Sequence, residues 1–293
     1  MRYVLENEHL VVEIESFGAE LKSVKSKSDE KREYMWQADP KFWGRTSPIL
    51  FPFVGGLKNK QYKYDGQCYP MGQHGFARDM EFDLVSKQDN EIWFSLLSNE
   101  ETLAKFPMEF KLSIGYQLTE NQVKILWKVE NPGEKVLHFS IGAHPAFNCP
   151  MYGEENKNGY SLSFGDANEI HHYGNPTATG LAVQEDILLT LQDHKTPITG
   201  DFFDRCTYMI EGRQIDTIGI VEPNGNEYIT VKFEMPIVAV WSPEQKNAPF
   251  LCIEPWWGRC DREDFEGTLE EREFGNQLAP NEVFDTEYTI IFS

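Results

Sequence analysis

Residues 122–129 read Gln-Val-Lys-Ile-Leu-Trp-Lys-Val, and this stretch decides the fold class. Four bulky apolar side chains recur at every second position: Val123, Ile125, Trp127 and Val129. Successive side chains of a β-strand point to opposite faces, so these four would share the face that is turned toward a core. The stretch therefore predicts a half-buried strand.

The same alternation recurs in residues 7–16, 159–165, 227–234 and 283–292. Between such runs lie residues that favour tight connections, namely Asp65-Gly66, Asn131-Pro132-Gly133, Asn158-Gly159 and Asn224-Gly225. Many short strands separated by turns, without regularly alternating long helices, predict an all-β protein built as a large antiparallel β-sandwich rather than a βαβ fold. We expect residues 283–292 to form a closing strand whose removal destabilises the fold.

Few segments have the pattern of a helix. Residues 98–106 predict a short helix with Ser98 or Asn99 as its N-cap, and the acidic stretch 261–272 predicts another turn or two. The chain shows no repeat of fixed period, no low-complexity block and no linker rich in proline, glycine or serine. We therefore expect one domain that spans residues 1–293.

Composition and charge narrow the classes of function. The 293 residues are 40% hydrophobic and include 20 Phe, 12 Tyr and 7 Trp, which is enough to fill a sizeable core. The formal net charge of −20 repels phosphate backbones and anionic lipid, so we expect neither nucleic acid nor membrane as a partner. Residues 1–8 lack the apolar core of a signal peptide, and no stretch has the length of a membrane span. These features predict a soluble, cytoplasmic protein and leave its oligomeric state open.

The five cysteines are odd in number, scattered and without close metal-ligand spacing. Cys252 and Cys260 are near enough in sequence to approach each other. We expect them to stay reduced, as is usual in the cytosol.

Two histidines stand out because their flanks are small. His144 lies in residues 141–147, Ile-Gly-Ala-His-Pro-Ala-Phe, and His74 lies in residues 73–78, Gln-His-Gly-Phe-Ala-Arg. Glycine and alanine beside a side chain leave room for a ligand or another strand to approach. Imidazole can act as an acid or a base near neutral pH, so both are candidates for proton transfer, with satisfied core histidines as the alternative. The remaining histidines are interpreted as packed, rim or loop residues: His9, His138, His171, His172 and His194.

Glu254 follows the apolar run 250–253 and precedes Pro255. A carboxylate among bulky apolar groups is costly to ionise, so its pKa should be raised toward the range of a general base that works near neutrality. The alternative is a buried glutamate paired with Arg45 or Arg78, and both interpretations can hold together.

Arginines and aromatic residues complete the candidate site. The guanidinium groups of Arg45 and Arg78 suit sugar hydroxyls, carboxylates or phosphates, although a surface salt bridge is the usual role of a single arginine. Flat faces for a sugar ring could come from four aromatic residues, each of which core packing explains equally well: Trp43, Phe76, Trp256 and Trp257.

Four segments together resemble the aldose 1-epimerase (mutarotase) family, and most closely its LacX-like branch. They are residues 47–52 (Ser-Pro-Ile-Leu-Phe-Pro), 73–78, 142–147 and 252–256 (Cys-Ile-Glu-Pro-Trp), and their order along the chain is that of the family. The resemblance implies the galactose mutarotase-like supersandwich and the interconversion of α and β anomers without a metal, nucleotide or redox cofactor.

By the same resemblance four candidate residues have roles. His144 is the acid that protonates the ring oxygen, and Glu254 is the base that removes the proton of the anomeric hydroxyl. His74 orients the sugar, Arg45 binds its hydroxyls at the pocket rim, and Arg78 and Trp256 are the further residues that we expect at the substrate. The substrate would be a free hexose or a hexose 6-phosphate.

One departure keeps alternatives open. Family members often place an aspartate at the sugar hydroxyls, and in residues 201–207 the matching position is interpreted as Cys206. This departure favours, as an alternative, a sugar-binding or sensing protein without turnover. A third interpretation treats His74, His144 and Glu254 as a metal triad, which the residue types permit. The surrounding motifs match the epimerase pattern better, so we expect no metal.

Overall fold

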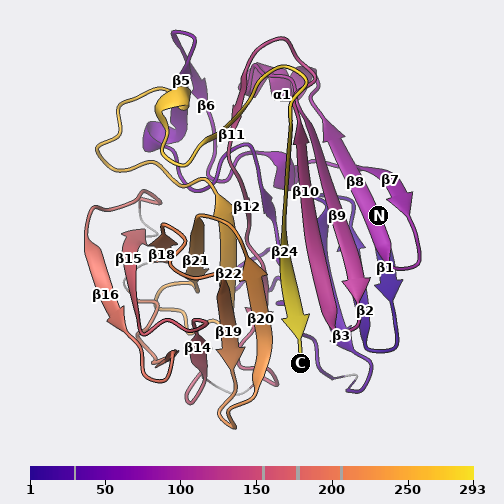
Figure 1. Ribbon diagram of the computed structural model, residues 1–293, viewed down its shortest axis with the longest axis vertical. Helices are drawn as coiled ribbons and strands as arrows, with labels where there is room; N and C mark the ends of the chain where they lie inside the picture. The colour runs from indigo at the N-terminus through magenta and orange to yellow at the C-terminus, as the bar shows by residue number, and fades with distance from the viewer. Residues whose placement is uncertain (30, 154–155, 176–178, 205–206) are drawn as a thin grey trace.

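The largest sheet has nine strands and forms one layer of the computed structural model, which describes residues 1–29, 31–153, 156–175, 179–204 and 207–293 (Figure 1). Its order is β17 (Lys195–Pro197), β14 (Ser161–Ser163), β19 (Thr217–Val221), β20 (Glu227–Phe233), β24 (Val283–Phe292), β10 (Gln122–Glu130), β9 (Lys111–Thr119), β8 (Glu91–Leu97) and β7 (Asp83–Lys87).

The second large sheet has eight strands. Its order is β16 (Asp186–Thr190), β15 (Glu169–Asn175), β18 (Thr207–Glu211), β21 (Ile237–Trp241), β22 (Phe250–Trp257), β12 (Ile141–Ala143) and β4 (Ile49–Leu50), with β13 (Ala146–Asn148) paired to β22 beside this path. Neighbouring strands in both large sheets run antiparallel. The predicted all-β antiparallel sandwich is therefore confirmed.

Smaller elements surround these sheets. They are the three-stranded sheet of β1 (Arg2–Glu6), β2 (Leu10–Glu15) and β3 (Glu20–Ser26), the hairpin of β5 (Gln61–Tyr64) and β6 (Gln67–Pro70), the pair β11 (Leu137–Phe139) and β23 (Asn276–Leu278), the helix α1 (Glu100–Lys105), and the 3₁₀ turns η1 (Lys58–Lys60), η2 (Ala77–Asp79) and η3 (Leu269–Glu271). Helices are thus few and short, as predicted.

Local chemistry explains where several elements begin and end. The predicted helix at 98–106 is α1, and Asn99 caps it, because its side-chain oxygen accepts a hydrogen bond from the Thr102 N–H at 3.0 Å. Of the predicted turns in 261–272, the structure has η3. Asp65 and Gly66 have positive φ values of 49° and 73° and connect β5 to β6, as the Asp-Gly pair predicts. The predicted closing strand is β24.

The main core includes the inner faces of the two large sheets and buried side chains of the three-stranded sheet, and along β10 it follows the period of two. The four apolar side chains of β10 that define its predicted inner face are all buried in this core. On β22, Leu251 and Ile253 belong to the same core, and the indole Nε1 of Trp257 donates a hydrogen bond to Thr286 Oγ1 of β24 at 3.0 Å. The alternate residues Cys252 and Trp256 pack into separate clusters on the other face of β22. Glu254 shares their parity and lies on this second face.

Cys252 and Cys260 are both buried thiols, and in the part of the chain that the structure describes neither forms a disulfide. Among the described residues, no helix has the length and apolar character that crossing a membrane requires.

Candidate active site

A cavity of about 290 Å³ opens on the second face of β22 and gathers all six predicted site residues. It is lined by Trp43, Arg45, Gln73, His74, Arg78, His144, Gly180, Thr207, Trp241, Glu254 and Trp256. A larger hollow of about 720 Å³ lies along β20 and β24, but its described lining contains no histidine and no buried carboxylate. The smaller cavity is therefore the candidate active site.

Two neighbouring strands bring His144 and Glu254 together. Strand β12 ends at Ala143, immediately before His144, and pairs with β22, where Gly142 lies opposite Trp256. The glycine is required there, because a Cβ atom at Gly142 would lie 2.6 Å from Cδ1 of the Trp256 indole. His144 Nε2 lies 3.3 Å from Glu254 Oε2, and the two side chains are only 9% and 2% exposed. The carboxyl partner of His144 is thus Glu254.

Burial controls the protonation of this pair. Burial raises the pKa of Glu254 well above its ordinary value of 4.5. Burial, and then the positive charge of Arg78, lowers the pKa of His144 to about 3. Both effects disfavour charge, so the pair holds one proton between the two groups, on the Glu254 carboxyl. Moving that proton across the contact would create a carboxylate and an imidazolium.

Two tryptophans hold the His144 ring. The Trp43 indole stacks on it with ring centroids 4.6 Å apart and an interplanar angle of 25°, and the Trp241 indole meets it edge-on at 5.3 Å. Within the described residues, Nδ1 of His144 is buried and has no hydrogen-bond partner. Packing rather than a hydrogen bond at Nδ1 therefore orients Nε2 toward Glu254.

A backbone hydrogen bond fixes the tautomer of His74. The Gly55 N–H donates to His74 Nδ1 at 3.1 Å, and the His74 N–H donates back to the Gly55 carbonyl at 3.0 Å. Burial, followed by the repulsion between the charged forms of His74 and His144, lowers the pKa of His74 well below 6.5, so its ring is neutral. A neutral ring that accepts at Nδ1 carries its proton on Nε2. His74 therefore offers a hydrogen-bond donor to a ligand.

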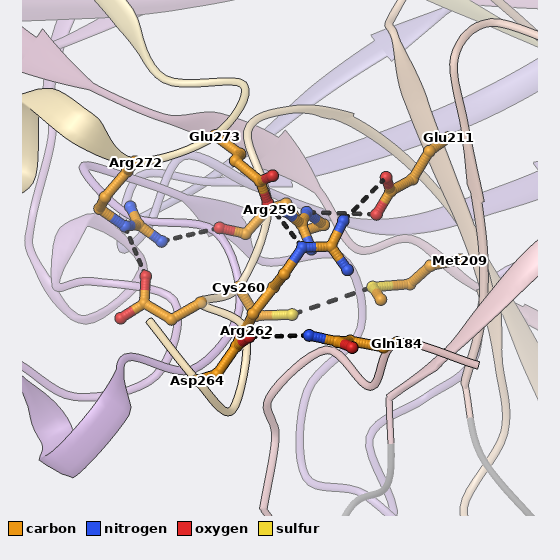
Figure 2. Close-up of polar contacts among 10 residues, drawn as sticks. Gln184, Met209, Glu211, Arg259, Cys260, Arg262, Asp264, Arg272 and Glu273 are labelled. Atoms are coloured by element: carbon orange, nitrogen blue, oxygen red, sulfur yellow. Dashed lines mark hydrogen bonds and ion pairs between the residues drawn. The ribbon is translucent and has the colours of Figure 1, made fainter. Parts of the chain in front are cut away.

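The loop that carries Gly55 is supported from behind by residues 259–261. Gly55 has a φ of 72°, and a Cβ atom there would lie 2.4 Å from Cβ of Cys260. The Asp261 N–H donates to the Gly56 carbonyl at 3.0 Å. Arg272 holds the supporting segment in turn, since its Nε donates to Asp261 Oδ1 and its Nη2 to the Arg259 carbonyl, both at 2.7 Å (Figure 2).

Figure 2 also shows the ion network that anchors this segment. Arg259, whose side chain is 1% exposed, pairs with Glu211 at 3.2 Å and with Glu273. Arg262 Nε lies 2.9 Å from the same Glu273 carboxylate. Burial lowers the pKa of Arg259 and raises the pKa of Glu211, while their mutual attraction opposes both shifts. None of these residues lines the cavity, so the network supports the fold behind the site.

The two predicted arginines lie at the cavity with one carboxylate partner. Arg45 Nη2 lies 2.7 Å from Asp79 Oδ1, while Arg78 Nε is 3.8 Å from Asp79 Oδ2. Arg78 also donates from Nη2 to the Gln73 carbonyl at 2.8 Å. Burial, and then the charge of Arg45, lowers the pKa of Arg78 to about 10. Among the described residues, both guanidinium groups lie nearest to Asp79, so the alternative that paired Glu254 with Arg45 or Arg78 is wrong.

Of the four aromatic residues that the sequence offered for a sugar ring, two line the cavity and two do not. Trp43 and Trp256 line the cavity, although the Trp256 Nε1–H is already committed to the Ala143 carbonyl at 3.1 Å. Trp257 faces the nine-stranded sheet instead, and Phe76 packs against Phe110 and Phe106 in the core. Phe76 is thus a core residue, whereas Trp257 is partly buried, packs against the core and lines the larger hollow.

Three residues of the lining were not predicted from the sequence: Trp241, Thr207 and Gly180. Trp241 could have been found, because alternation along residues 237–241 gives it the parity of Ala239, which lies opposite Glu254. Thr207 belongs to residues 201–207, the segment in which the aspartate of the family is expected. Cys206, the position aligned to that aspartate, lies outside the described residues.

The donor atoms that could hold a metal ion differ from the predicted triad. Within the described residues, the group of histidine, cysteine and carboxylate atoms that lie close together consists of His144, Cys252 and Glu254. His74 is not part of this group. The predicted set of His74, His144 and Glu254 is therefore not the one that the fold assembles.

Comparison with known proteins agrees with this geometry. The family model described as aldose 1-epimerase matches residues 1–284. The protein LacX (chromosomal) of Lactococcus lactis subsp. lactis is 30% identical over 298 residues, which cover 99% of each chain. The structure of a galactose mutarotase related enzyme from Lactobacillus acidophilus superposes with a TM-score of 0.94 and 33% identity, over 100% of this chain and 97% of that chain. A galactose mutarotase-like protein from Lactobacillus casei ATCC 334 gives a TM-score of 0.91 and 30% identity over the full length of both chains.

Proposed function

The chain belongs to the aldose 1-epimerase family, and from this we propose that it interconverts the α and β anomers of a hexose or hexose 6-phosphate by acid–base catalysis. The observation that carries the proposal is the contact of 3.3 Å between His144 and Glu254 in the candidate active site. The two oxygens that exchange protons in this reaction, the ring oxygen and the anomeric hydroxyl, are bonded to the same carbon. An acid and a base that serve both oxygens must therefore lie close together.

The position of the proton that His144 and Glu254 share determines which of them acts as the acid and which as the base. When the proton resides on His144, the pair consists of an imidazolium acid and a carboxylate base. Glu254 takes the proton of the anomeric hydroxyl while His144 gives its proton to the ring oxygen. The bond between C1 and the ring oxygen breaks, and a carbonyl group forms at C1. The pair again holds one proton, now on Glu254, so no net charge is gained or lost.

Ring closure reverses these transfers. The open aldehyde rotates about the bond between C1 and C2 and presents its other face. His144, now neutral, removes the proton of the hydroxyl that attacks C1, and Glu254 returns its proton to the carbonyl oxygen. Proton transfer by positioned groups typically contributes about 10²–10⁴-fold to a rate. The proposed reaction requires no metal, nucleotide or redox cofactor.

The other lining residues hold the sugar in this proposal. His74 donates a hydrogen bond from Nε2 and orients the ring, while Trp43, Trp241 and Trp256 supply apolar walls. Arg45 and Arg78 bring two guanidinium groups against the one carboxylate of Asp79. This excess of positive charge supports recognition of hydroxyls and is compatible with a phosphate on the sixth carbon.

The test follows the approach to anomeric equilibrium by polarimetry or NMR, starting from a pure anomer. Glucose, galactose and their 6-phosphates should include a substrate whose rate rises in proportion to enzyme. An unchanged spontaneous rate for all four would reject catalysis on common hexoses. Saturable binding in a calorimeter without any rate increase would instead identify a sugar-binding protein. A cytoplasmic location and a single domain stay predictions beside this function.

A further inference from the structure

Cys252 lies beside the proposed catalytic pair and has no role in the epimerase mechanism. It precedes Glu254 by two residues on β22, so both side chains are on the face that carries the cavity. Cys252 is completely buried. Its Sγ atom, a ring nitrogen of His144 and a carboxylate oxygen of Glu254 all lie within 4.8 Å of one another.

The spacing of these atoms suits a tetrahedral metal ion. Zinc binds imidazole nitrogen and carboxylate oxygen at about 2.0–2.2 Å, which sets the distance between two ligand atoms of a tetrahedron at about 3.3–3.6 Å. The separation of His144 Nε2 and Glu254 Oε2, 3.3 Å, falls within this range before any metal is bound. Zinc binds sulfur at about 2.3 Å, a longer bond than those to nitrogen and oxygen, and Sγ of Cys252 lies within 4.8 Å of the other two ligand atoms.

We propose that His144, Cys252 and Glu254 form a binding site for Zn²⁺ that competes with the sugar. Nitrogen, sulfur and oxygen donors together favour a borderline-soft ion such as Zn²⁺ over Mg²⁺ or Ca²⁺, which take oxygen ligands. Three protein ligands leave the fourth position for a water molecule on the cavity side. Binding displaces the thiol proton of Cys252 and the proton held by the pair, and both protons pass to solvent.

The charges of the bound site balance. One thiolate and one carboxylate cancel the two positive charges of the ion, and neutral imidazole adds none. A buried group without net charge is compatible with Arg45 and Arg78 at the same cavity, whereas an uncompensated cation there would be repelled. Both the charges and the spacing of the three ligands therefore suit a Zn²⁺ ion at this cavity.

Occupation by zinc would stop the epimerase, because the metal takes the nitrogen lone pair and the carboxylate that transfer protons. Sugar and zinc would therefore exclude each other. This inhibitory consequence rests on the proposed function, whereas zinc binding itself does not.

Binding is tested first, on protein stripped of metal with a chelator. Zn²⁺ is titrated in competition with a chromogenic chelator, for the wild type, Cys252→Ser and the control Cys260→Ser, which changes another buried thiol outside the cavity lining. We expect one Zn²⁺ per chain, affinity weakened by at least about tenfold in Cys252→Ser, and little change in Cys260→Ser. Circular dichroism and thermal melting show whether each variant is folded. Wild type that binds no zinc, or affinity that is equal in wild type and Cys252→Ser, would overturn the site.

Two further measurements separate the site from the function. Co²⁺ in place of Zn²⁺ should give a thiolate-to-metal charge-transfer band in the near ultraviolet that is lost in Cys252→Ser, whether or not the protein is an epimerase. With a sugar that turns over, Zn²⁺ should raise the apparent KM of the wild type and leave kcat at saturating sugar unchanged. Zinc that binds through Cys252 but leaves the epimerase rate unaffected would contradict the competition with sugar. If the protein has no epimerase activity, the Zn²⁺ and Co²⁺ titrations still decide whether the metal site exists.

Discussion

His144 Nε2 and Glu254 Oε2 lie 3.3 Å apart in a buried contact, although His144, which follows β12, and Glu254, which lies on β22, are distant in sequence. Because burial opposes charge on both groups, they act as one unit that holds a single proton. This relationship makes the pair suitable for moving a proton between two oxygens on one carbon, and it has consequences for activity and for stability.

Removing either member should abolish most of the rate enhancement. In Glu254→Gln the base is lost, and in His144→Ala the acid is lost, so the rate of anomer interconversion should fall by about 10²–10⁴-fold. The measurement is polarimetry with the spontaneous rate subtracted. A matched control is Glu211→Gln, which changes another largely buried glutamate outside the cavity. This variant should lower the free energy of unfolding and leave the catalytic rate near the wild-type value. Nearly full activity in Glu254→Gln would contradict the mechanism.

Stability should depend on pH through Glu254. The pKa of this carboxyl is raised in the folded protein, so its contribution to stability is fully present below 4.5 and is lost as the pH rises through the folded pKa. Glu254→Gln cannot ionise, and its free energy of unfolding relative to the wild type should therefore increase as the pH rises from 4.5. Urea unfolding at a series of pH values measures this difference. The exposed control Glu134→Gln should follow the wild type across the series.

Two tryptophans on opposite sides of β22 should respond differently to substitution. Trp43→Leu removes the ring that stacks on His144, and kcat/KM should fall roughly two- to tenfold, the equivalent of an aromatic contact. Trp257→Leu removes a hydrogen bond to Thr286 on the core side, so it should lower the melting temperature and leave kcat/KM near the wild-type value. A large loss of activity in Trp257→Leu, with none in Trp43→Leu, would contradict the assigned faces.

Gly55 should tolerate no side chain. Gly55→Ala places a Cβ atom 2.4 Å from Cys260 and imposes a positive φ on alanine, which costs about 1–3 kcal/mol for the backbone alone. Gly66→Ala is the matched control, since Gly66 has nearly the same φ of 73° but no atom within 4 Å of its Cβ position. Gly55→Ala should be the more destabilised in urea unfolding.

The same change should also disturb His74, because Gly55 supplies the N–H that fixes its tautomer. Nitrogen-15 NMR of the imidazole should show the proton on Nε2 in the wild type and a mixture of tautomers in Gly55→Ala. An unchanged His74 spectrum in that variant would show that the tautomer has another cause.

Strand β24 should be essential to the nine-stranded sheet, because it lies between β20 and β10. Ile290→Ala removes a completely buried side chain and should cost about 2–5 kcal/mol. Its neighbour Ile291 points to the opposite face and is less buried, so Ile291→Ala should cost clearly less. Deleting residues 283–293 should prevent folding, as judged by circular dichroism. A folded truncated chain would overturn this view of β24.

Much of the fold could be predicted because a strand is specified locally. The alternation of β10 and β24, the Asp-Gly turn between β5 and β6, and the cap at Asn99 all depend on residues that are neighbours in sequence. Phe76 and Trp257 show the limit of this reasoning. An aromatic side chain suits a core and a sugar site equally well, and only the position of its strand decides between them.

By itself, the sequence determined the all-β class and picked out the six predicted residues that line one cavity. It also determined that Cys252, Glu254 and Trp256 share a face, since the period of a strand is two. Only the tertiary structure decided that Glu254 meets His144 rather than Arg45 or Arg78, and that Gly55 sets the tautomer of His74. The physical reason is that strand parity is a local property, whereas the partner of a strand or a loop is chosen by packing between segments that are distant along the chain.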